Sequence, residues 1–154
     1  MLDTPEITQT PARQTAVIHV TVPRTDVQKV MGPGVQELMS TVAAQGIGPA
    51  GPWFTHHLRK PSDTFDFEIS VPVTAPVTPE GRVEGSEWPA MKVARAVYRG
   101  SYEGLGAAWG EFDAWVKASG HKPAPDLWEV YVAGPESGSD PAEWRTELNR
   151  PLIG

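Results

Sequence analysis

The 154-residue chain contains no cysteine. This absence excludes disulfides, zinc–thiolate centres and thiol nucleophiles together. The chain also lacks any apolar run near the ~18 residues that a membrane-spanning helix needs. Its N-terminus, MLDTPEITQTPARQ, has no apolar core of the kind found in signal peptides. We therefore expect a cytoplasmic protein.

Basic runs, phosphate-binding loops and nucleophile motifs are missing as well. The net charge is −6, so direct binding to nucleic acid is disfavoured. There is no glycine-rich phosphate loop and no G-x-S-x-G motif, and no cofactor is expected. His56 and His57 are adjacent on a predicted strand, so they point to opposite faces and cannot chelate one ion. No metal site is predicted.

Alternating and helical patterns follow one another along the chain. Steps of four and three residues in the apolar pattern predict two helices, one ending at Gly46 with a start near Pro33, the other between Ser101 and Gly120. Strands are predicted over residues 15–22, 52–58, 65–73, 91–99, 127–133 and 143–152. Residues 75–90 and 134–142 are predicted to be loops.

This order contains an internal repeat. Placing Gly46 on Gly120, an offset of 74 residues, matches residues 32–50 to 106–124 at seven identical positions. About one or two identities would be expected by chance from average composition. Each half reads strand–helix–strand–strand, and neither half can bury its sheet face alone. The sequence thus predicts an α+β fold built from a duplicated β-α-β-β unit, with two helices on one face of an antiparallel sheet and a ligand groove on the other.

The repeat selects one unusual side chain, the carboxylate in the strand LWEVYVA. At the same offset Glu129 and Tyr131 superpose on Thr55 and His57, so these four side chains are expected to share one face. We expect that face to be the one without helices. Phe54, Trp128, Val130 and Val132 are expected to pack against the helices.

Five segments give the chain a family resemblance: GxxPAGPWFTHHL, FDFEISVPV, YRGSYEGLGAAWGEF, LWEVYVAGP and DPAEWRTELNRPL. In this order they resemble the GyrI-like small-molecule-binding domains, which occur alone and as effector-binding domains of AraC-type and MerR-type multidrug regulators. The resemblance covers about residues 15–152. It implies one domain over residues 1–154 made of two repeats, about 15–74 and 91–152. The 14 residues before the first predicted strand are too few for a helix-turn-helix, so we expect no DNA-binding domain.

The resemblance also implies a function. Members bind bulky aromatic or lipophilic cations, and a strand glutamate that takes the cationic end corresponds to Glu129. The predicted lining is Glu129, Tyr131, His57, Trp53 and Thr55, with Tyr102 and Trp88 at the margin. The family often has a tyrosine where this chain has His57. Trp109, Phe112 and Trp115 recur at helical spacing and are predicted to be core residues.

Two alternatives stay open. Some GyrI-like proteins hydrolyse cyclopropane-containing DNA-alkylating natural products, and in that case Glu129 and Tyr102 are the candidate catalytic residues. The family is also named for gyrase inhibition, so an uncovered sheet face is a candidate surface for a protein partner. Glu68 and Glu147 are repeat mates, and as carboxylates they are weaker candidates for acid–base chemistry.

Overall fold

The computed structural model describes residues 2–58, 63–133, 140 and 143–153. The chain forms two compact units, and each is described by itself. We call Pro11–Ala90 the N-unit, and Met1–Thr10 together with Met91–Gly154 the C-unit. Each unit contains one long helix and antiparallel strands.

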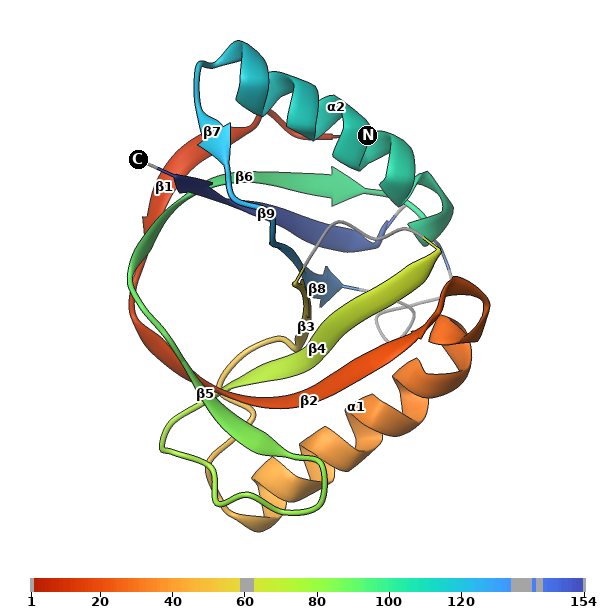
Figure 1. The fold of residues 1–154 in the computed structure, drawn as a ribbon, viewed down its shortest axis with the longest axis vertical. Helices are drawn as coiled ribbons and strands as arrows, with labels where there is room; N and C mark the ends of the chain where they lie inside the picture. Colours follow the sequence, from red (N-terminus) through yellow and green to blue (C-terminus); the bar gives the residue numbers. More distant parts are fainter. Residues whose placement is uncertain (1, 59–62, 134–139, 141–142, 154) are drawn as a thin grey trace. The chain divides into compact units, whose positions relative to one another are not determined.

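Along the sequence of the N-unit, the helix follows the first strand and precedes the second, and the four strands form an antiparallel sheet (Figure 1). Its strands are in the order β3-β4-β2-β5, and every pairing is antiparallel. A 3-10 turn, η1, leads into the helix. The elements are β2 (Arg13–Pro23), η1 (Arg24–Asp26), α1 (Val27–Ala44), β3 (Phe54–His57), β4 (Thr64–Val73) and β5 (Glu84–Trp88).

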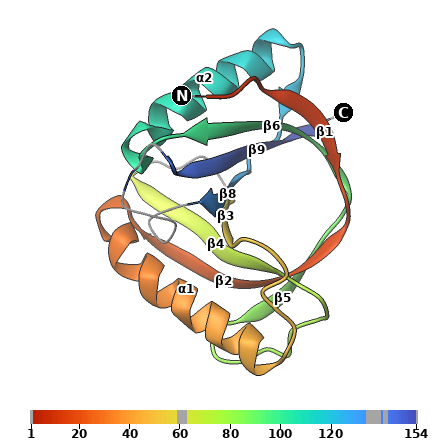
Figure 2. The ribbon, with the colours of Figure 1, turned by 180° about the vertical axis from the view of Figure 1, so that it is seen from behind.

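Helix α1 packs on one face of this sheet, along β2 and β4 in both ribbon views (Figures 1 and 2). Leu38 and Val42 are fully buried there against alternate residues of the two strands. A Cβ added to Gly34 would lie 2.5 Å from the Ile69 Cδ1 atom, so the helix and β4 approach closely at a residue without a side chain. The expected start near Pro33 is wrong. The helix begins at Val27 and contains Pro33, and packing of the apolar stripe outweighs the hydrogen bond that proline cannot donate.

The C-unit repeats this plan. Its strands are in the order β1-β6-β9-β8, and β7 pairs with β9. Along the sequence, the helix again follows the first strand of the repeat, β6. The elements are β1 (Glu6–Thr10), β6 (Met91–Arg99), η2 (Tyr102–Gly104), α2 (Leu105–Ala118), β7 (Lys122–Pro123), β8 (Leu127–Ala133) and β9 (Arg145–Ile153).

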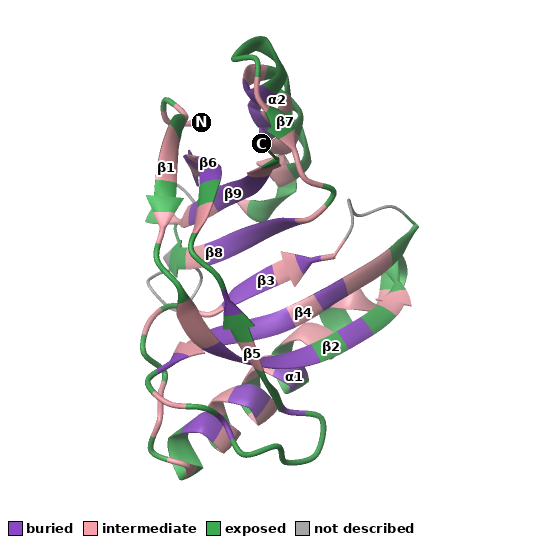
Figure 3. Cartoon of the chain, turned by 60° about the vertical axis from the view of Figure 1, so that its left-hand side comes forward, coloured by how far each residue is buried: buried purple, intermediate pink, exposed green. Residues whose placement is uncertain are grey.

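The core of the C-unit lies between α2 and the face of the sheet that α2 covers. Phe112 and Val116 of the helix are fully buried against Ala94, Ala96 and Leu148. Figure 3 shows buried positions, in purple, along much of β8 and β9. The small alanines of β6 leave room on this face for larger side chains from the helix and from β8.

Both helices end in the same way. Gly46 and Gly120 have φ of 68° and 79° and follow the last cap residue. In the N-unit the Ile47 N–H donates to the Val42 carbonyl, and in the C-unit the His121 N–H donates to the Val116 carbonyl. These are Schellman motifs, which satisfy carbonyls at the end of a helix.

The backbone past each helix is also repeated. The Ala50 N–H donates to the Pro72 carbonyl at 2.9 Å, and the Ala124 N–H donates to the Pro151 carbonyl at 2.8 Å. The α+β class and the duplicated β-α-β-β unit are therefore confirmed.

Some elements were not predicted. Residues 75–90 contain β5 as well as loop, and the N-terminal segment contains β1. Ser101 precedes η2, and α2 itself starts after Gly104. Most of the predicted loop 134–142 lies outside the described residues. Among the helices that the structure describes, none is long and apolar enough to cross a membrane.

Candidate functional site

Glu129 lies at the centre of β8 and faces α2. Its partner on β9 is Leu148, which packs against Phe112 and Val116 of the helix. Residues directly opposite on neighbouring antiparallel strands share a face. The Glu129 side chain is 9% exposed, so this carboxylate is buried within the C-unit.

The expected face was therefore wrong. Trp128 and Val130, predicted to pack against the helix, pair with Asn149 and Glu147 on the opposite face. Alternation along a strand determines which residues share a face, but not which face a helix covers. Trp128 and Val130 are 1% and 9% exposed although they lie on the face opposite α2. Residues on both faces of β8 are thus buried, and the apolar residues of the strand do not mark the face that the helix covers.

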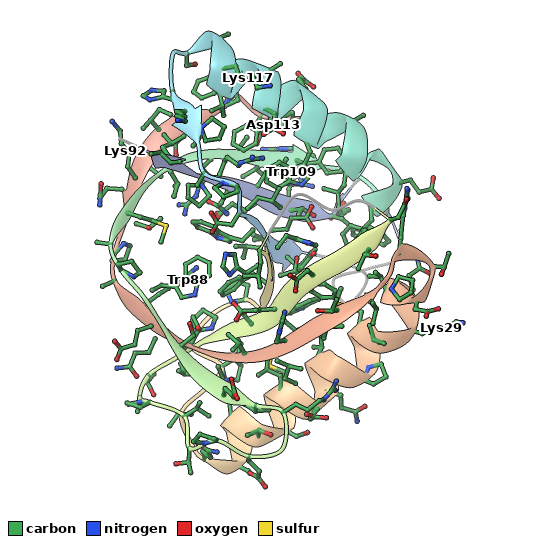
Figure 4. The ribbon with its side chains drawn as sticks, viewed as in Figure 1. Lys29, Trp88, Lys92, Trp109, Asp113 and Lys117 are labelled. Atoms are coloured by element: carbon green, nitrogen blue, oxygen red, sulfur yellow. The ribbon has the colours of Figure 1, made fainter. Side chains whose placement is uncertain are left out.

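Two uncharged donors hold the Glu129 carboxylate. The indole Nε1–H of Trp109 donates to Oε2 at 2.6 Å, and the Tyr131 hydroxyl donates to Oε1 at 2.9 Å. Trp109 comes from α2 and is labelled in Figure 4, whereas Tyr131 is two residues along β8 from the carboxylate. Each oxygen thus has one fixed partner.

Burial dominates the electrostatics of this carboxyl group. Desolvation raises the pKa of Glu129, while the hydrogen bonds from Trp109 and Tyr131 act in the lowering direction. No ion pair to Glu129 occurs among the described residues of the C-unit. A carboxylate in this state is stabilised by any cation that reaches it.

Aromatic rings extend from the carboxylate toward the surface. The Tyr102 ring lies 6.0 Å from the Tyr131 ring and 5.1 Å from the Trp144 ring, measured between centroids. Tyr102 is 37% exposed. We call Glu129, Trp109, Tyr131, Tyr102 and Trp144 the Glu129 cluster. The structure thus brings Glu129, Tyr131 and Tyr102 together, on the side of β8 that faces α2.

Three other predicted residues lie in the N-unit, on the face that carries α1. Thr55 and His57 pair with Ile69 and Phe67, and Trp53 packs against the same core. The His57 ring stacks on Phe67 at 5.4 Å, and its Nε2 atom lies 3.3 Å from the Thr55 hydroxyl. Burial, with a smaller contribution from His56, lowers the pKa of His57 to about 4. His57 is therefore neutral at pH 7.

Trp88 does not join that face. It lies in β5 and packs edge-on against Phe54 and His56, on the side of the sheet opposite α1. The Nδ1 atom of His56 lies 3.0 Å from a Glu68 carboxylate oxygen on this side. His56 and His57 thus point to opposite faces, as expected. No three histidine or acidic side chains of the described residues are placed to hold a metal ion together.

The prediction that Trp109 is a core residue is confirmed, since it packs against the core of the C-unit, but its hydrogen bond to Glu129 was not predicted. Helical spacing places it on the buried side of α2, which is correct, but it carries no information about the indole N–H. The repeat contains a signal: at an offset of 74 residues Trp109 stands where the N-unit has Val35, and Glu129 stands where it has Thr55. At these two positions the C-unit has a large side chain with a hydrogen-bond donor and a carboxylate, where the N-unit has two smaller, uncharged side chains.

The fold and these contacts can be compared with known proteins. A model of the GyrI-like small molecule binding domain family matches residues 3–152. The chain belongs to this family. A search of curated proteins found no match.

Several solved structures share the fold. The EcmrR C-terminal domain superposes with a TM-score of 0.86 at 22% identity, and the match covers 97% of each chain. A hydrolase from Listeria innocua has a TM-score of 0.68 at 13% identity, covering 97% of this chain and 91% of that one. SAV2435 bound to tetraphenylphosphonium has a TM-score of 0.64 at 11% identity, covering 99% and 95%. At these identities the similarity shows the fold alone.

Proposed function

We propose that this GyrI-like domain binds bulky aromatic or lipophilic cations, with Glu129 as the charge partner. The observation that carries the proposal is the buried carboxylate, whose two oxygens accept hydrogen bonds from uncharged Trp109 and Tyr131. This arrangement orients the carboxylate without neutralising it.

The energetics favour a cationic ligand over a neutral one. Burial makes the ionised form of Glu129 unfavourable, so its pKa is raised in the free protein. A cation in contact with the carboxylate offsets that cost, whereas a neutral ligand of the same shape does not. Part of the binding free energy therefore comes from pairing a buried charge.

The neighbouring rings suit a ligand that is both aromatic and cationic. Tyr102, Tyr131 and Trp144 present faces and edges to one another at 5.1 and 6.0 Å, and ring faces attract cations by about 0.5–2 kcal/mol. Tetraphenylphosphonium, the ligand in the SAV2435 structure, has this chemistry. The shared fold makes it a reasonable first probe for this chain.

A titration tests the proposal. Purified protein is titrated with tetraphenylphosphonium and with the fluorescent cation rhodamine 6G, wild type against Glu129→Gln, by tryptophan quenching and anisotropy. Gln keeps the shape and an acceptor but removes the charge. We expect about a tenfold loss of affinity, which corresponds to about 1.4 kcal/mol.

A matched control lies in the same unit. Glu147 is on the face of the sheet opposite α2 and pairs with Arg95 at 3.3 Å. Glu147→Gln removes the same charge from the chain without touching the Glu129 cluster, so its affinity should equal that of wild type. Equal losses in both variants would mean that net charge, and not a specific carboxylate, governs binding.

A second candidate function is hydrolysis of a cyclopropane-containing electrophile. The raised pKa of Glu129 favours a protonated carboxyl group beside the Tyr131 hydroxyl, which is the form a general acid needs. Water would add to a ring carbon as a ring C–C bond breaks, and Glu129 would donate its proton to the departing electron pair and regain one from the water. Mass spectrometry of a cyclopropane-bearing alkylator incubated with protein tests this. No hydrated product above the buffer rate would exclude that substrate.

A further inference from the structure

We infer that Thr146 is a second hydrogen-bonding group for the ligand of the Glu129 cluster, and that it selects cations with an N–H over fully alkylated ones. This inference rests on the proposed function and deepens it. It concerns which class of cation the site prefers.

Thr146 is a buried hydroxyl without a partner. Its side chain is fully buried, and its Oγ1 atom makes no hydrogen bond to any of the described residues. It pairs with Tyr131 on β8 and with Tyr98 on β6, so all three side chains share the face that α2 covers. Nearly all buried hydroxyls in folded proteins have a partner, so this exception requires an explanation.

The two neighbouring tyrosines do not supply that partner. The Tyr131 hydroxyl donates to Glu129 Oε1, and the Tyr98 hydroxyl donates to the Ser101 carbonyl at 2.8 Å. Their protons are therefore directed away from Thr146. The Thr146 Oγ1 atom is therefore available to accept a hydrogen bond from a bound ligand.

The repeat shows that the fold itself does not need a hydroxyl here. Thr146 pairs with Tyr131 as Phe67 pairs with His57, so Phe67 is its equivalent in the N-unit. Phe67 is fully buried in an apolar core. The C-unit instead has a smaller, polar side chain at a position where burial without a partner is destabilising. It does so two residues along β9 from Leu148, the residue opposite Glu129.

The geometry lets one cationic group contact both residues. Thr146 and Glu129 are diagonal neighbours on one face, roughly 7–8 Å apart at Cα, and Tyr131, which is opposite Thr146, donates to Glu129. Each carboxylate oxygen accepts more than one hydrogen bond, so Glu129 retains capacity beside Trp109 and Tyr131. An ammonium with two or more N–H groups can donate to Glu129 and to Thr146 at once. A trimethylammonium or phosphonium can satisfy the charge but not the hydroxyl.

A matched pair of probes tests the inference. The probes are 3,3-diphenylpropylammonium and its N,N,N-trimethyl derivative, which share the aromatic part and the charge at pH 7.5. Both are titrated calorimetrically into wild type, Thr146→Val and Thr146→Ser. Val has the same shape without the hydroxyl, and Ser keeps the hydroxyl.

We expect wild type to bind the primary ammonium about tenfold more tightly than the trimethyl derivative, because hydrogen bonds to charged groups are the stronger ones. Thr146→Val should lose about tenfold for the primary ammonium and stay within about twofold for the trimethyl derivative. Thr146→Ser should restore the preference. Thr146→Val should also unfold at a higher temperature than wild type, because the unpaired buried hydroxyl is gone.

The outcomes separate this inference from the proposal beneath it. If wild type binds both probes, Glu129→Gln weakens both and Thr146→Val changes neither, the inference is wrong and the proposed function stands. Equal loss of both probes in Thr146→Val also overturns it, since that indicates a packing effect. If wild type binds neither probe, the inference and the proposed function are both wrong.

Discussion

The N-unit and the C-unit have the same β-α-β-β plan and differ in the side chains that pack beneath their helices. Both helices end at a left-handed glycine, and in both units an alanine N–H past the helix donates to a proline carbonyl of the last strand of the repeat. Beneath α1 the repeat has Thr55 and Phe67, next to the neutral imidazole of His57 and an apolar core. Beneath α2 the equivalent residues are Glu129 and Thr146. The two units thus keep one β-α-β-β plan while these side chains on the helix-covered face differ.

Two of the polar changes in the C-unit are contacts between a helix residue and a strand residue. Trp109 of α2 donates to Glu129 of β8, and one turn further along the helix Asp113 accepts from Arg150 of β9 at 3.1 Å (Figure 4 labels both helix residues). At the equivalent positions the N-unit has Val35 with Thr55, and Met39 with Val71. Paired changes of this kind show that a duplicated fold can take on a polar site when both sides of the contact change together.

The largest expected effect comes from breaking one such pair. Arg150→Val leaves Asp113 without its guanidinium partner, and the side chains of the pair are only 10% and 16% exposed. Removing one member of a buried pair costs about 3–5 kcal/mol, because the other charge stays desolvated. Urea unfolding at pH 7 should show this loss.

The double variant Asp113→Met with Arg150→Val restores the residues of the N-unit and is the control. It removes both charges, so its free energy of unfolding should return to within about 1 kcal/mol of wild type. If the double variant is as unstable as Arg150→Val, the two units differ in more than the matched pair and the comparison between them fails here.

The second prediction uses pH, because the two units should respond to it in opposite directions. His57 has a pKa of about 4 in the folded N-unit against 6.5 when unperturbed, so the unfolded chain binds more protons between these values. The stability contributed by neutral His57 is complete above pH 6.5 and is lost as pH falls toward 4, by about 3 kcal/mol. The raised pKa of Glu129 acts in reverse: its burial costs least at low pH, and stability falls as pH rises through that pKa.

Two variants isolate these contributions. The difference in unfolding free energy between wild type and His57→Phe should shift by about 3 kcal/mol in favour of the variant as pH falls from 7 to 4. The difference between wild type and Glu129→Gln should shift in favour of the variant as pH rises. A His57→Phe difference that stays constant with pH would mean that this imidazole is not desolvated.

The sequence predicted the repeat, the strand containing Glu129 and the shared face of Glu129 and Tyr131, because period and offset are properties of the chain. It could not predict which face α2 covers. Polarity pointed to the wrong face, because Trp128 and Glu129 are both buried and only the register of β8 with β9 shows which of them faces α2. The role of Trp109 was hidden for a similar reason: a tryptophan on the core side of a helix looks the same whether or not its N–H has a buried acceptor. Trp88 was placed in a loop because β5 forms by pairing with β2, a long-range contact that local pattern does not encode.

The smallest effect tests what the two units have in common. Gly46 and Gly120 both have positive φ, and a Cβ added to either would meet no atom within 4 Å. The cost of Gly→Ala is therefore conformational alone, about 1 kcal/mol in each unit. Gly46→Ala and Gly120→Ala should lower the free energy of unfolding by equal amounts, measured by urea denaturation at pH 7. The ligand affinity of both variants should match that of wild type, since each glycine lies past the end of its helix and outside the Glu129 cluster. A clearly larger loss at Gly120 would show that the end of α2, and not only its polar face, has diverged from α1.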